Sequence, residues 1–148
     1  MVLDRNMLYV MSADPNNLRI LGQVIRFAQE HHARLTLLDV IDSLPRASRM
    51  LITSVPTSNL RNGIVRNRLE QLEMLVSRIG SGAVELRARV LFGHRAKQIV
   101  HETKDGGYDL VIKSPERGGT DRYLLKHSEC PVWLLQPDDY DAAGQCLV

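Results

Sequence analysis

The stretch NMLYVMSADPNNLRILGQVIRFAQEHHARLTLLDVI, residues 6–41, decides the fold class because two short apolar runs flank a segment of helical periodicity. The runs at 6–11 and 34–41 are typical of strands covered by helices on both faces. Between them, apolar residues recur every three or four positions, and Asp14-Pro15 supplies an N-cap followed by a first-turn proline. The stretch therefore predicts a βαβ unit whose helix ends near residues 31–32.

The rest of the chain repeats this alternation. Residues 42–59 carry serines, threonines and two prolines, and predict a long loop. Three further helices are predicted, from residue 60 to the glycines at 80 and 82, from residue 94 to the glycines at 106 and 107, and a short one ending near residue 128. Three further strands are predicted at 84–91, 109–113 and 131–136. Apolar and polar residues alternate within 84–91, which places that strand at or near a sheet edge.

Five strands that alternate with four helices predict an α/β fold, a doubly wound five-stranded parallel sheet with helices on both faces. In such a sheet, ligands bind in the crevice at the carboxyl ends of the strands. The loops that follow Met11, Val40, Leu91 and Lys113 are therefore the ones that would form a site.

Length and composition agree with one ordinary globular domain. The chain has 148 residues, of which 44% are hydrophobic and 24% charged, and its formal net charge is +2. These values exclude disordered and disulfide-built classes, and the longest apolar runs are far too short to span a bilayer, so we expect a cytoplasmic protein. We expect one domain over residues 1–137, followed at 138–148 by an acidic linker or tail that resembles the start of a second, truncated domain.

Basic residues gather in one part of the chain. No acid occurs between residues 43 and 69, and this stretch carries five arginines, Arg46, Arg49, Arg61, Arg66 and Arg68. A nucleic-acid-associated regulator would use such a stretch, but no aromatic residue lies among the arginines to stack on bases. We expect a solvated face and keep the nucleic-acid role as an alternative.

No pattern of residues predicts catalysis or a metal site. The chain lacks a Gly-x-Ser-x-Gly elbow, and its five histidines are spread over separate elements without completing a ligand set. His94 lies in a crevice loop, where it would either contact a ligand or cap the helix that follows. We therefore expect no catalytic residue, no metal and no enzymatic activity.

Several segments, in order, resemble the universal stress protein family over about residues 7–136. The matching segments are 6–14, 33–40, Gly93 with Ile99, 108–112 and 130–135. The resemblance is closest to the first domain of tandem universal stress proteins, which carry two such domains in one chain. It implies a Rossmann-like fold and a role in the response to stress.

Family members that bind ATP carry a Gly-x-x-Gly, nine residues, Gly-Ser/Thr signature after the fourth strand. Glycines let the backbone approach phosphates, and N–H groups at the next helix start complement their charge. Here only residues 114–117 separate Lys113 from Gly118, and Pro115 removes one donor. Ser12 also replaces the acid that binding members keep after strand one, unless Asp14 substitutes for it.

We therefore expect no cofactor, with ATP or AMP as the alternative. If a nucleotide binds, the resemblance implies a site made of Ser12, Asp14, Val40, Gly93, His94, Ser114, Gly118, Gly119 and Thr120. Without a ligand, Gly118-Gly119 forms a tight turn.

The last strand contains Val132, Trp133, Leu134 and Leu135 and is predicted to form an edge. A short apolar edge strand is prone to aggregation unless something covers it. The resemblance implies that it pairs with the same strand of a second domain, by self-association or within a tandem chain. The alternative is that the tail from Pro137 covers this edge.

Overall fold

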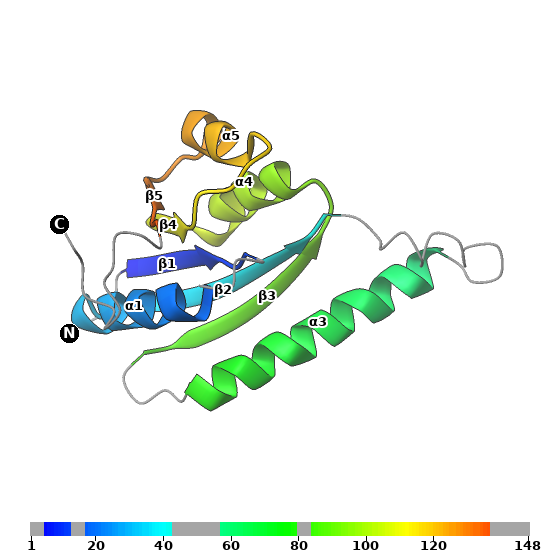
Figure 1. Ribbon diagram of the computed structural model, residues 1–148, viewed down its shortest axis with the longest axis horizontal. Helices are drawn as coiled ribbons and strands as arrows, with labels where there is room; N and C mark the ends of the chain where they lie inside the picture. Colours follow the sequence, from blue (N-terminus) through cyan, green and yellow to red (C-terminus); the bar gives the residue numbers. More distant parts are fainter. Residues whose placement is uncertain (1–4, 13–16, 43–56, 80–83, 137–148) are drawn as a thin grey trace.

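The computed structural model describes residues 5–12, 17–42, 57–79 and 84–136, which form one parallel sheet with helices on both faces (Figure 1). The sheet has five strands in the order β3-β2-β1-β4-β5, and every neighbouring pair is parallel. The predicted doubly wound α/β fold is confirmed. In chain order the elements are β1 (Arg5–Val10), α1 (Asn17–Glu30), β2 (Ala33–Ile41), α3 (Thr57–Ile79), β3 (Leu86–Phe92), α4 (Arg95–Gly106), β4 (Leu110–Lys113), α5 (Thr120–His127) and β5 (Val132–Leu134).

Some element boundaries differ from the prediction. The loop expected over residues 42–59 ends earlier, because α3 begins at Thr57, directly after Pro56. A proline before the first turn is compatible with a helix, since the first helical N–H groups need no partner within it. Residues 43–56, the remainder of that expected loop, lie outside the described residues. The edge position predicted for the strand at 84–91 is confirmed, although β3 starts two residues later, at Leu86.

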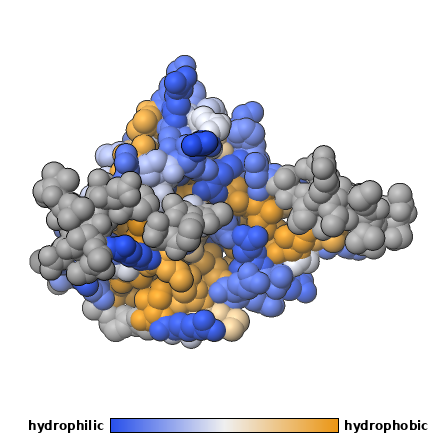
Figure 2. All heavy atoms as spheres, in the orientation of Figure 1, coloured by the Kyte–Doolittle hydropathy of each residue, from blue (hydrophilic) through white to orange (hydrophobic). Residues whose placement is uncertain are grey.

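Successive side chains of the strands enter two cores on opposite faces of the sheet. On one face, α1 and α3 pack against Met7, Tyr9, Leu35 and Leu37. On the other face, α4 and α5 cover a second set, made of Leu8, Val10, Leu38, Val40 and Val111. Figure 2 shows apolar atoms exposed between α1 and α3, whereas the side formed by α4 and α5 is mostly polar in this view.

Among the described residues, none of the helices combines the length and the apolar character needed to cross a bilayer.

Candidate functional site

A cleft with about 500 Å³ of space lies at the carboxyl ends of the central strands, where the topology predicts a crevice. Its walls come from the ends of β1 and β2, the start of α4, the loop after β4, and α3. The lining residues are Met11, Ser12, Asp39, Val40, Arg68, Arg95, Pro115 and Glu116.

Arg95, the first residue of α4, joins two sides of this cleft. Its Nε donates to both carboxylate oxygens of Glu116, at 2.9 and 3.0 Å. Its second guanidinium nitrogen, Nη2, donates to the Met11 carbonyl oxygen at 3.0 Å. The guanidinium therefore connects the end of β1 to the loop between β4 and α5.

Lys113, the last residue of β4, supplies a second cation to the same carboxylate. Its side chain is only 1% exposed. Its Nζ donates to Glu116 Oε1 at 2.9 Å, to the Ser114 carbonyl oxygen at 2.8 Å and to Asp121 Oδ1. The other carboxylate oxygen of Asp121 accepts the Glu116 backbone N–H at 2.9 Å. The buried lysine is thus compensated by two carboxylates, as a charge removed from water requires.

We call Arg95, Lys113, Glu116 and Asp121 the ionic cluster. It carries two positive and two negative charges, and its members come from α4, β4, the β4–α5 loop and α5. The cluster was not predicted from the sequence. The sequence does place acids three and eight positions after Lys113, which ends an apolar strand. This spacing indicates ion pairs only once the chain is known to turn back after β4.

Beyond the ionic cluster lies a second cavity of about 270 Å³. Arg95 and Glu116 line both spaces, so this ion pair stands between them. The second cavity is also lined by predicted site residues, namely His94, Gly118, Gly119 and Thr120. His94 is the N-cap of α4, and its Nδ1 accepts the Lys97 backbone N–H at 3.4 Å, which confirms the capping alternative.

Six of the nine predicted site residues thus fall into two groups. Ser12 and Val40 line the first cleft, whereas those at 94 and 118–120 line the second. Gly93 has a φ of 144°, a backbone conformation that residues with a Cβ rarely adopt, so this turn favours glycine. Asp14 lies outside the described residues.

Ser114 is buried at the end of β4, next to Lys113. Within the described part of the chain, its Oγ is the one buried side-chain oxygen or nitrogen that lacks a hydrogen-bond partner. An orphaned buried hydroxyl is costly, so we expect this one to bond to a group outside the described residues, such as a water molecule, a ligand or another part of the chain.

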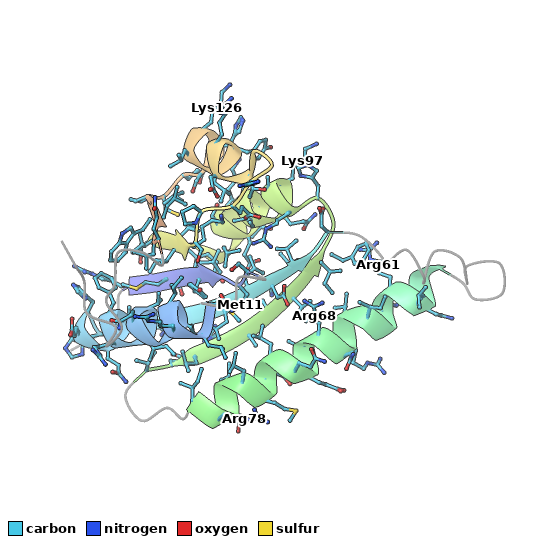
Figure 3. The ribbon with its side chains drawn as sticks, in the orientation of Figure 1. Met11, Arg61, Arg68, Arg78, Lys97 and Lys126 are labelled. Carbon is cyan, nitrogen blue, oxygen red and sulfur yellow. The ribbon has the colours of Figure 1, made fainter. Side chains whose placement is uncertain are left out.

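Two of the arginines considered for nucleic acid are engaged within the protein. Arg68 donates to Asp39 at 2.8 Å, and the Arg61 guanidinium lies 4.8 Å from the centre of the Phe92 ring. Both side chains extend from α3 toward the sheet (Figure 3). Arg46 and Arg49 lie outside the described residues.

A separate polar network lies on the α4 side of β3, away from the cleft. The buried Glu102 carboxylate accepts the Tyr108 hydroxyl at 3.0 Å and pairs with Arg89 at 2.6 Å. Burial raises the pKa of the Tyr108 hydroxyl above its usual range, and the Glu102 charge adds to the shift. At the surface nearby, hydrogen bonding to Arg87 lowers the pKa of the Glu85 carboxyl.

The Tyr108 shift predicts a loss of stability in alkaline solution. Below about pH 10, the ordinary tyrosine pKa, both the folded and the unfolded chain keep this proton. As the pH rises further, the unfolded chain ionises first, so the free energy of unfolding falls until the pH passes the folded pKa. Tyr108→Phe should remove this part of the slope in urea unfolding, whereas Tyr123→Phe should retain it. Equal slopes in the two variants would contradict the prediction.

The outer edge of β5 is a second candidate surface. The Val111 N–H donates to the Pro131 carbonyl oxygen at 3.0 Å, and the Leu135 N–H donates to the Lys113 carbonyl oxygen at 2.8 Å. Because alternate residues of a parallel strand bond to opposite sides, Val132 and Leu134 direct their backbone groups away from β4.

Apolar side chains flank this edge. Trp133 is 38% exposed and packs edge-on against Phe27 of α1, with 5.1 Å between the ring centres. Leu135 is buried in the core shared with α1. The predicted edge position of the last strand is confirmed, and residues 137–148, the alternative cover for this edge, lie outside the described residues.

Among the described residues, no group of three or more histidine, cysteine, aspartate or glutamate side chains is arranged to hold a metal ion.

The curated proteins that this chain resembles include longer proteins, and the chain aligns to about half of their length. Universal stress protein E of Escherichia coli (strain K12) is 21% identical, with 100% of this chain aligned to 50% of that protein. The chain therefore spans about half the length of the curated relatives it matches.

Solved structures share the fold. Universal stress protein UspA from Lactobacillus plantarum has a TM-score of 0.64 at 20% identity, covering 91% of this chain and 99% of that one. A universal stress protein family protein from Arabidopsis thaliana with AMP bound has a TM-score of 0.59 at 18% identity, covering 95% and 97%. The model of the Universal stress protein family matches residues 5–136. Because all five strands of the described sheet lie inside that match, this chain belongs to the universal stress protein family.

Proposed function

We propose that this chain is a non-catalytic domain of the cytoplasmic stress response, one that associates through β5 and does not bind ATP. The observation that carries the proposal is the ionic cluster. The Glu116 carboxylate lies in the cleft at the carboxyl ends of the strands, where a nucleotide-binding member of such a fold would hold anionic phosphates.

The loop between β4 and α5 leaves few donors for a triphosphate. It contains only residues 114–119, because β4 ends at Lys113 and α5 begins at Thr120. Pro115 has no N–H, and the N–H of Glu116 is already bonded to Asp121. The Glu116 charge would also repel a phosphate placed beside it, unless Arg95 and Lys113 released the Glu116 carboxylate and bound the phosphate instead.

The edge position of β5 supports association through this strand. Among the described residues no further strand pairs with β5, and backbone groups that point outward beside a partly exposed tryptophan favour the addition of another strand. A second domain of a longer chain and a second copy of this one would use the same edge chemistry. The half-length match to universal stress protein E supports a second domain as the natural partner.

The alternative function is nucleotide binding. It is favoured by the buried Ser114 hydroxyl, which has no partner among the residues that the structure describes, and by the AMP bound to the Arabidopsis protein of similar fold. A nucleotide would then have to displace the Glu116 carboxylate, and the Ser114 hydroxyl would gain a partner.

Isothermal titration calorimetry with MgATP separates the two functions. We expect no binding heat in the micromolar range from the protein purified without added nucleotide, and no nucleotide released when that protein is denatured. A micromolar dissociation constant, or co-purification of an adenine nucleotide, would overturn the first proposal and establish the alternative.

A further inference from the structure

We infer that Arg95 and Lys113 form an oxyanion site that the chain fills with its own Glu116 carboxylate, and that the site accepts free phosphate when this carboxylate is removed. The inference concerns the same cleft as the proposed function and deepens it. It assigns oxyanions as the ligand class of this site, and it makes the Glu116 carboxylate a ligand that the chain itself supplies.

The contacts of Glu116 are those of a bound anion. Arg95 Nε contacts both carboxylate oxygens, and Lys113 Nζ approaches one of them from the end of β4. The two cations are themselves held in place. Arg95 is anchored to the Met11 carbonyl oxygen, and Lys113 to the Ser114 carbonyl oxygen. Donors fixed in this way need little reorganisation to bind another anion.

Burial distinguishes this site from an ordinary surface pair. The side chains of Lys113 and Arg95 are 1% and 16% exposed. Glu85 also lies between two cations, Arg34 and Arg87, but those side chains are 46% and 61% exposed. Water and salt screen the Glu85 group, so its cations hold an anion only weakly.

Removal of the Glu116 side chain would leave the rest of the site in place. The bond from the residue-116 backbone N–H to Asp121 does not depend on the side chain, so Glu116→Ala retains it. Asp121 continues to compensate one of the two cations, and the cluster changes from neutral to a net charge of +1. The vacated space opens into the cleft of about 500 Å³, so a phosphate ion has room.

The test measures thermal unfolding in phosphate and in chloride at matched ionic strength. For Glu116→Ala we expect a phosphate dissociation constant on the order of 1 mM, and a Tm in about 100 mM phosphate that is higher than in chloride by roughly 9 °C. The wild-type chain and the matched control Glu85→Ala should show no such difference.

A second variant guards against a loss of folding. Glu116→Gln keeps the side-chain volume and should show the same preference for phosphate with a smaller amplitude. If Glu116→Ala folds only in phosphate, that result also supports the inference. Equal Tm values in the two salts for both variants, or a shift of equal size in Glu85→Ala, would overturn it.

AMP and adenosine identify the source of the anion. If the site takes a phosphate group alone, AMP should stabilise Glu116→Ala no more than inorganic phosphate does, and adenosine should have no effect. A larger effect of AMP would assign the site to nucleotides and overturn the assignment to free phosphate. Failure of the proposed function is seen separately, as ATP binding by the wild-type chain.

Discussion

Replacement of Lys113 by methionine is expected to lower the free energy of unfolding by about 3 kcal/mol, which corresponds to roughly 10 °C in Tm for a domain of this size. Methionine fills a similar volume but carries no charge, so the Glu116 and Asp121 carboxylates would lose the cation that they share. The two carboxylates are partly buried, at 25% and 18% exposed, and removal of their buried cation leaves the cluster with a net negative charge. Urea unfolding of the purified variant measures the loss.

Lys126→Met is the matched control, because Lys126 is an exposed lysine of α5 (Figure 3). Its substitution should change stability by about 0.5 kcal/mol or less. The double variant Lys113→Met/Asp121→Asn should recover part of the loss, since Asp121, whose cation in the cluster is Lys113, becomes neutral while Glu116 keeps Arg95. A Lys113→Met protein as stable as the Lys126→Met protein would show that the ionic cluster contributes no net stability.

The fold could be predicted because its signals are local. Apolar runs such as residues 34–41, helix periodicity in 18–28 and the glycines at 106–107 each specify an element from a few neighbouring residues. Gly107 does adopt a left-handed conformation, with a φ of 64°, at the C-cap of α4. Parallel strands with short connections then leave few arrangements, so the topology followed from the elements.

The contents of the cleft could not be predicted in this way. Sequence reasoning located the crevice and the short loop after Lys113, but it did not show that Arg95 reaches both Glu116, 21 residues away, and Met11, 84 residues away. Ion pairs carry no periodic signal, and 24% of this chain is charged, so the number of conceivable pairs is large. Lys113 in particular has the pattern of a strand end that emerges into water, yet it is among the most buried side chains of the protein.

Leu134→Pro is expected to weaken self-association by ~100-fold, or ~2.7 kcal/mol, and to leave the fold intact. Proline removes the outward N–H of residue 134, which an added strand would need as a donor. The bonds between β4 and β5 that involve Pro131 and Leu135 do not use this group. Sedimentation over a range of concentrations measures the dissociation constant of each variant.

Leu134→Ala separates the backbone effect from the side-chain effect, because alanine shortens the side chain but keeps the N–H. If backbone pairing at this edge holds two domains together, the alanine variant should retain most of the affinity and the proline variant should lose it. If Trp133 and its apolar neighbours instead provide the contact without strand pairing, both variants should weaken association to a similar, smaller extent. A monomeric wild-type chain would contradict edge pairing. Proline and alanine variants of equal affinity would also contradict it, because loss of the residue-134 N–H would then have no effect beyond that of the side chain, and a donor without effect is not bonded across the interface.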